Sequence, residues 1–192
     1  MRPMLSIRRP AVLVAATLLV LTTGCSSDGG DTDAGADANP TAPSTPPQTA
    51  PAPTIDTDVA TSPQGRAIDT WAAAYARAIN QGDHSFTGVA DAPAVREWME
   101  RHAAPEWGRY LPGPLPVAPL GVRPVGDTER EVEACVQVSG WSQESRSVRR
   151  TRSRDVVGMT FRVTQATGGW QVERITSAEV DCRGVVPPTR NW

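Results

Sequence analysis

The spacing of apolar residues predicts a long amphipathic helix that begins near Ser62 and ends at Gly82. Its apolar stripe recurs at intervals of three and four residues and consists of Ile68, Trp71, Ala72, Tyr75 and Ile79. Ser62 offers a hydroxyl N-cap to this helix, and Gly82 suits the left-handed conformation that ends many helices. A second, shorter helix is expected between Asp91, as its cap, and Pro105, as its stop. Its apolar face would carry Val95, Trp98, Met99 and His102.

The period changes from helical to alternating after about residue 130. One predicted strand places Val132, Ala134, Val136 and Val138 on one face, and a second does the same with Val157, Met159, Phe161 and Val163. Gly168-Gly169 predicts a tight hairpin turn into a last strand over 170–180, whose alternation shifts near Arg174, as at a β-bulge. The prolines of residues 112–124 allow at most an edge strand there. Helices followed by antiparallel strands predict an α+β domain, with the helices packed on one face of a curved sheet.

The N-terminal segment has the pattern of an export signal. Three arginines precede an apolar stretch from Ala11 to Leu21, which is too short to span a bilayer and ends in the small residues before Cys25. Gly24-Cys25 resembles the lipobox of bacterial lipoproteins, although Thr22 stands where that motif usually has leucine. The resemblance implies cleavage before Cys25, lipid attachment to this cysteine, and a protein held on the extracytoplasmic face of the cell membrane.

Composition divides the remaining chain into a linker and a folded part. Residues 25–65 carry six acidic side chains, no basic one and no aromatic one, which predicts a disordered segment. We therefore expect a signal peptide over residues 1–24, a linker over 25–63 and a folded domain over 64–192. All 19 basic residues are arginine, and residues 66–192 are nearly neutral. This balance gives no reason to expect nucleic acid as a partner.

The order of elements, together with the hairpin entry Gly169-Trp170-Gln171-Val172, resembles the NTF2-like (SnoaL-like, cystatin-like) fold. The resemblance covers roughly residues 64–183 and implies a cone formed by a long first helix on a strongly bent sheet. The chain also resembles a group of actinobacterial lipoproteins of unknown function, in which a mid-sheet cysteine and a cysteine after the last strand occur as a pair.

Cys135 and Cys182 are the two cysteines of the expected domain. An exported domain with an even cysteine pair favours a disulfide, because the extracytoplasmic compartment is more oxidising than the cytosol. The alternative is two buried thiols. In a simple meander Cys182 lies beyond the end of a strand two places from Cys135, so the chain would have to turn back for the bond to form.

Few polar residues are placed to do chemistry inside the expected cone. Enzymes of the resembled fold use an acidic residue or histidine and a tyrosine there. Tyr75 and His102 lie on the inner helix stripes with Trp71 and Trp98, and these four residues are the candidate pocket. The alternative interpretation is that all four are packed core residues. Glu131, Glu133, Glu173 and Glu179 are expected to face solvent, and neither a metal site nor a cofactor site is predicted.

Five arginines crowd one predicted hairpin tip: Arg146, Arg149, Arg150, Arg152 and Arg154. They form either a solvated turn or a contact surface for anionic lipid headgroups or an acidic wall polymer. The favoured function is a non-enzymatic, membrane-anchored module that binds another envelope component, with a protein as the first choice of partner. The alternative is a small apolar-ligand-binding or catalytic pocket protein of the SnoaL-like type.

Overall fold

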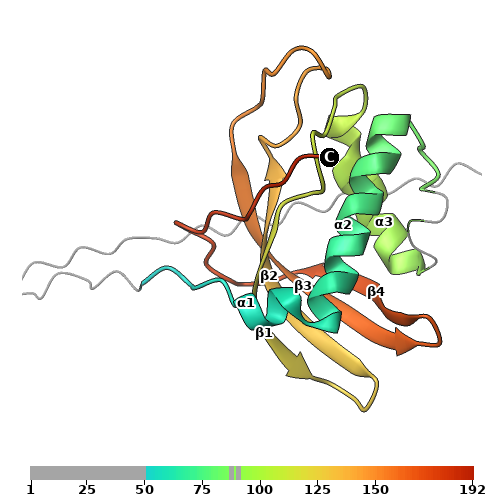
Figure 1. The fold of residues 1–192 in the computed structure, drawn as a ribbon, viewed down its shortest axis with the longest axis vertical. Coiled ribbons are helices and arrows are strands. Elements are labelled where there is room, and N and C mark those ends of the chain that lie inside the picture. Colours follow the sequence, from blue (N-terminus) through green and yellow to red (C-terminus); the bar gives the residue numbers. More distant parts are fainter. Residues whose placement is uncertain (1–50, 87–88, 90–91) are drawn as a thin grey trace, which may run out of the picture. The chain divides into compact units, whose positions relative to one another are not determined.

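The computed structural model describes residues 51–86, 89 and 92–192, and in them helices precede a four-stranded antiparallel sheet. The helical elements are α1 (Thr57–Thr61), α2 (Pro63–Gln81), α3 (Pro93–Ala103) and the 3₁₀ turn η1 (Ala104–Glu106). The strands are β1 (Val117–Pro124), β2 (Glu129–Ser139), β3 (Asp155–Ala166) and β4 (Gly169–Ser177). Helices α2 and α3 pack on one face of the sheet (Figure 1), which confirms the α+β class. Within these residues, no helix combines the length and apolarity needed to cross a bilayer.

Helix α2 has the boundaries and buried face that its apolar stripe predicts. The Ser62 hydroxyl accepts a hydrogen bond from the amide of Gly65 (3.1 Å) and caps the first turn. At the other end Gly82 adopts φ 67°, and its N–H donates to carbonyls of the last turn. The five stripe residues are all buried. Helix α3 begins at Pro93 with Ala92 at its N-cap, and the predicted cap Asp91 lies outside the described residues.

Helix α1 corrects the predicted extent of the disordered linker, because it lies inside residues 25–63. The carboxylate of Asp56 accepts hydrogen bonds from the amides of Asp58 and Val59, each at 3.0 Å. The amide of Asp56 in turn donates to the carbonyl of Pro119 in β1 (2.8 Å), and Val59 is buried against the domain. One capping aspartate and a few apolar contacts fix this short segment, and average composition does not reveal them. Residues 25–50 lie outside the described part of the chain.

The strands form a meander in the order β1-β2-β3-β4, with every neighbouring pair antiparallel. In the β3–β4 ladder Arg162 pairs with Arg174 and Val163 pairs with Val172, so Glu173 is the extra residue of a bulge. The shift of alternation predicted near Arg174 is therefore confirmed.

Strand β1 lies at the edge of the sheet, as its prolines predict. Pro119 and Pro124 lack an N–H, and the ladder with β2 is irregular between Pro119 and Gly121. The amide of Asp56, which lies outside the sheet, donates a hydrogen bond to the Pro119 carbonyl. The edge is thus interrupted at Pro119 and partly covered by the segment that leads into α1.

Cys135 and Cys182 form a disulfide, and their Cα atoms lie 5.7 Å apart. The chain after β4 turns back across β3 at Gly158, which pairs with Cys135 in the β2–β3 ladder. The amide of Ala178 donates to the Gly158 carbonyl (3.0 Å). A Cβ on Gly158 would lie 2.8 Å from the carbonyl oxygens of Ala178 and Val180. The missing side chain lets the chain pass directly over β3 to Cys135.

This return covers the face of the sheet opposite the helices and gives β2 two buried faces. Ala118, Cys135, Cys182 and Val185 form a small second apolar cluster there. Glu131 also points to this face and is 8% exposed, so the expectation that it faces solvent is wrong. Arg162 in β3 donates to its carboxylate (2.7 Å), and Arg123 in β1 pairs with it as well.

Candidate functional site

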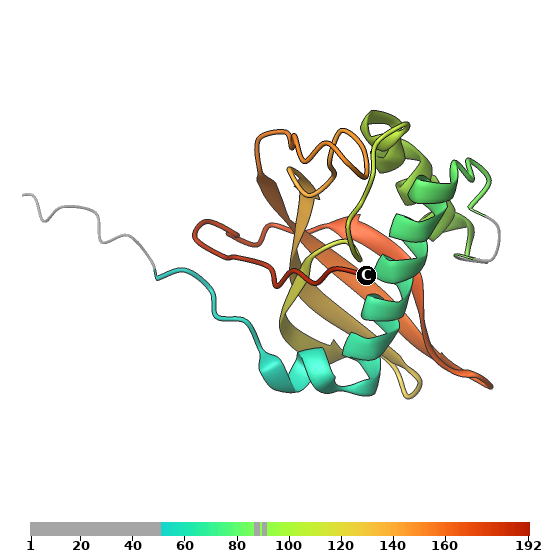
Figure 2. The same ribbon diagram turned by 45° about the horizontal axis from the view of Figure 1, so that its top comes forward.

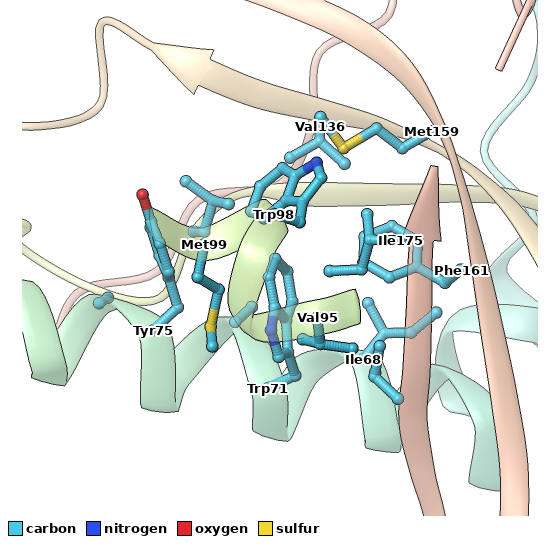
Figure 3. Close-up of a cluster of buried hydrophobic side chains, with 14 of the residues drawn as sticks. Ile68, Trp71, Tyr75, Val95, Trp98, Met99, Val136, Met159, Phe161 and Ile175 are labelled. Atoms are coloured by element: carbon cyan, nitrogen blue, oxygen red, sulfur yellow. The ribbon is translucent and has the colours of Figure 1, made fainter. Parts of the chain in front are cut away.

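The four residues predicted to line a pocket lie together at one end of the helix–sheet core. The ring centroid of Trp71 is 5.4 Å from those of Trp98 and Phe161 and 5.9 Å from that of Tyr75. The rings of Trp71, Tyr75, Trp98 and Phe161 are all buried. Figure 3 shows them packed between α2, α3 and the sheet. Trp71 and Trp98 thus fill the interior as core residues.

A small cavity remains beside this aromatic cluster. It is lined by Tyr75, Trp98, His102, Glu106, Leu111, Leu115, Gln137, Val138, Ser139, Trp141 and Ser142. Its volume is about 10 Å³, which is the space that a single water molecule requires. In this conformation the cavity is too small for an organic substrate.

Glu106 is the acidic residue in the lining of this cavity, and the sequence pattern did not indicate it. Its side chain is buried, with the residue 5% exposed, and Oε2 has no hydrogen-bond partner. The other oxygen, Oε1, lies 3.7 Å from the Arg152 guanidinium. Burial raises the pKa of Tyr75 well above its ordinary value, and the nearby Glu106 charge raises it further. Glu106 follows Pro105 in the single turn η1. A single turn has no periodicity that would predict which of its side chains face the core.

His102 is held by its own helix. Its ring stacks on Trp98 with centroids 4.1 Å apart, and Nδ1 lies 2.9 Å from the Trp98 carbonyl. A carbonyl can only accept, so Nδ1 carries the proton of this bond. The interpretation of His102 as a packed histidine near a helix C-terminus therefore describes its contacts best.

The arginine-rich segment, residues 140–154, is an ordered hairpin, which we call the arginine hairpin. Gln143 and Tyr110 exchange two backbone hydrogen bonds, at 2.7 and 3.0 Å. Within the hairpin the Glu144 amide donates to the Arg150 carbonyl (2.9 Å), and the Arg109 side chain donates to Ser142 and to the Arg150 carbonyl. Figure 1 shows the hairpin in orange beyond the ends of β2 and β3. This backbone is fixed well enough to present side chains in defined positions.

Three of the five arginines are already engaged by the domain. Arg150 lies 3.5 Å from the carboxylate of Glu144 and is highly exposed. Arg152 faces Glu106 at the cavity, and Arg154 donates to a backbone carbonyl of the C-terminal segment (3.1 Å). The contacts of Arg152 and Arg154 hold the base of the hairpin on the body of the domain.

The other two arginines face a surface cleft of about 270 Å³, which we call the arginine cleft. The guanidinium of Arg146 lies 5.2 Å above the ring of Tyr110. Arg149 makes no ion pair with any residue that the structure describes. The complete lining is Tyr110, Pro112, Gln143, Arg146, Arg149, Asn191 and Trp192.

The remaining predicted site residue, Cys25, lies outside the described part of the chain. Across residues 51–86, 89 and 92–192, no three His, Cys, Asp or Glu side chains are grouped to hold a metal ion. No known protein-family model matches the chain, and a search of curated proteins also finds no match.

Proposed function

We propose that the protein is a lipid-anchored extracytoplasmic lipoprotein whose folded domain is a non-enzymatic binding module for another component of the cell envelope. The observation that carries this proposal is the filled interior. Trp71, Trp98 and Phe161 occupy the space between helices and sheet, and about 10 Å³ is left beside them. Recognition therefore falls to the surface, where an ordered cationic hairpin borders a much larger cleft.

Two features support the proposed location. The charged start, short apolar stretch and Gly24-Cys25 match the pattern of a lipoprotein signal. The bond between Cys135 and Cys182 agrees with folding in an oxidising compartment. The two features are independent, since one lies in the leader and the other in the domain.

We also propose that residues 64–183 belong to the NTF2-like fold. A long helix followed by a second helix and an antiparallel meander supports this assignment. The bulge at Glu173 and the return of the chain across β3 support a bent sheet.

The anchor is tested by Cys25→Ala in the native host. We expect the variant to leave the membrane fraction, because the lipid chains that hold the protein cannot then be attached. Immunoblotting of membrane and soluble fractions measures this, with Ser26→Ala as the neighbouring control. Retention of the Cys25→Ala chain in the membrane would contradict lipid anchoring.

Binding to the envelope is tested by cross-linking the intact chain in living cells. A photoreactive residue in place of Val148, which is 42% exposed on the arginine hairpin, should yield a defined adduct. The same residue in place of Glu97, an exposed position of α3, is the control. Equal adducts from both positions, or none from either, would contradict a binding surface at the hairpin.

A small apolar-ligand-binding or catalytic pocket protein is the second candidate. The aromatic walls of the cavity suit an apolar ligand, and the unpaired Oε2 of buried Glu106 next to Tyr75 and His102 suits a catalytic role. Its test is the fluorescence of 1-aminoanthracene added to the intact chain. An enhancement that Trp98→Ala alters and Arg101→Gln does not would favour this candidate. Fluorescence equal to that of the free dye favours the surface module.

A further inference from the structure

We propose that the arginine cleft binds an acidic polysaccharide. A sugar ring would lie against Trp192, and the carboxylate or phosphate that the sugar carries would bind Arg146 and Arg149. This inference rests on the proposed function, since it names the class of envelope component that the module takes.

The cleft is prepared for an anion. Stacking on Tyr110 orients the planar guanidinium of Arg146 and leaves its N–H edges for a carboxylate or phosphate. Arg149 lines the same cleft without an ion-pair partner among the described residues, and no acidic side chain is part of the lining. Two guanidinium groups in a lining without acidic side chains offer N–H donors to an anionic group.

The cleft also contains a fixed aromatic surface. Trp192 is 49% exposed, yet its indole Nε1 donates to the Leu111 carbonyl (3.0 Å) and its amide donates to the Pro112 carbonyl (3.0 Å). The Arg77 guanidinium lies 4.8 Å from its ring. An exposed ring held by three contacts loses little freedom when a ligand packs on it.

The chain that carries Trp192 is fixed close to the residues before β1. Any Cβ on Gly113 would collide with the carbonyl oxygen of Arg190, so these two segments can approach only because residue 113 is glycine. Arg190 also donates to the carboxylate of Asp69 in α2 (2.6 Å). The aromatic wall of the cleft is therefore part of the fold.

The polar lining suits a sugar better than a simple anion. Gln143 and Asn191 contribute amides, which both donate and accept and therefore match hydroxyl groups. A concave site that combines cations, an aromatic face and amides fits a ring that carries an acid group and several hydroxyls.

The arginine cleft is remote from the segment that leads into the domain. Figures 1 and 2 show α1, near which the described chain begins, at the other end of α2 from the arginine hairpin. Asn80 in the last turn of α2 bonds to Leu111, beside Tyr110, whereas α1 precedes the first turn. An extended polymer that enters the cleft therefore does not have to pass the segment that leads into the domain.

The test measures binding of the full lipidated chain, in detergent micelles, to immobilised polygalacturonate and to a phosphate-bearing mannan. Neutral dextran, polyglutamate and glycerol phosphate, which is the headgroup of phosphatidylglycerol without its acyl chains, are the comparison ligands. We expect at least one of the two acidic polysaccharides to bind, and its affinity should fall as the salt concentration rises. The polysaccharide that binds more tightly shows whether the cleft prefers a carboxylate or a phosphate. Dextran should not bind, and polyglutamate should bind about tenfold more weakly because it has no ring to pack on Trp192.

The variants separate the arginine pair from general charge. R146Q/R149Q should weaken binding by about tenfold or more, because two charge-assisted contacts are lost. R101Q/R183Q removes the same charge from exposed positions elsewhere and should leave binding unchanged. W192A should weaken binding by about tenfold, while W192F, which keeps a ring, should stay within about threefold of the native chain.

Four results would overturn the inference: binding of glycerol phosphate without polysaccharide binding, equal binding of polyglutamate, equal losses in R146Q/R149Q and R101Q/R183Q, or native affinity in W192A. The cross-linking experiment at position 148 distinguishes a wrong ligand class from a wrong proposed function. If the hairpin still forms its adduct while both polysaccharides fail to bind, the proposed binding module stands and only the ligand class is wrong.

Discussion

Gly158 decides whether the end of the chain can reach the middle of the sheet. It pairs with Cys135 in the β2–β3 ladder, and the chain at Ala178 and Val180 crosses directly over it. A side chain at this position would meet two backbone carbonyls, which cannot move aside as a flexible side chain can. One absent methyl group therefore permits the bond between Cys135 and Cys182.

We expect Gly158→Ala to destabilise the domain by about 1–3 kcal/mol, because the crossing segment must shift away from β3. The same shift should slow formation of the disulfide. Urea denaturation and thiol titration of freshly refolded protein measure the two effects. Gly121→Ala in β1 is the matched control, since nothing lies within 4 Å of its added Cβ. Equal stability of the two variants would contradict this account of the crossing.

At the scale of elements, Glu131 ties three strands together. Its carboxylate in β2 accepts from Arg162 in β3 and pairs with Arg123 in β1, so one buried charge has a partner in each neighbouring strand. The hydrogen bond from Arg162 is the largest cause that lowers the pKa of Glu131 below its ordinary value of 4.5, and the charges of Arg123 and Arg162 add to it. Burial acts in the opposite direction.

This geometry predicts a pH-dependent contribution to stability. A lowered pKa in the folded state means that the stabilisation is complete above pH 4.5 and is lost as the pH falls through the folded pKa. Glu131→Gln should therefore lower the free energy of unfolding by about 1 kcal/mol at pH 7. The difference from the native chain should shrink below pH 4.5.

Urea denaturation across a pH series measures the difference, and Glu133→Gln serves as the control because this neighbour is exposed. A deficit of Glu131→Gln that stays constant down to pH 2 would show that the ion pairs are not its source.

Most of the elements could be predicted from local patterns. The stripe of α2, the alternation of β2 and β3, and the bulge in β4 all reflect contacts with one side of the core, and such contacts leave a period in the sequence. Helix α1 leaves no period, because it has a single turn with one buried residue, Val59. The burial of Glu131 was not predictable either, since its partners Arg123 and Arg162 belong to the two neighbouring strands and only the strand register brings them to it.

At the scale of the whole molecule, the disulfide closes a loop of 47 residues in sequence separation. It links the centre of the sheet to the segment that covers the second face. In the chain-entropy model a loop of this length stabilises the fold by about 4 kcal/mol.

We therefore expect the double variant Cys135→Ala/Cys182→Ala to lose about 4 kcal/mol of unfolding free energy. Denaturation of the oxidised native chain, the reduced native chain and the double variant measures the loss. Reduction should bring the native chain close to the variant. An unchanged midpoint in both would show that the second face is held without the bond.

The two parts of the candidate site differ in how far the sequence indicates them. Tyr75, Trp71 and Trp98 lie on helix stripes and could be placed inward, although not distinguished from ordinary core residues. The arginine cleft joins Tyr110, the arginine hairpin and Trp192, which are far apart in the chain. Only the fold brings these three segments together. Gly113 permits the close approach of the Trp192 segment, but a single glycine does not reveal that contact in the sequence.

The interrupted edge of β1 has a consequence for molecules crowded on one surface. Two copies that met along this strand would each need a row of free N–H and C=O groups to extend the sheet from one molecule to the next. Pro119 and Pro124 remove donors from that row, and the amide of Asp56 has already taken one carbonyl. High local concentration should therefore not convert neighbouring copies into an amyloid-like ribbon through this strand.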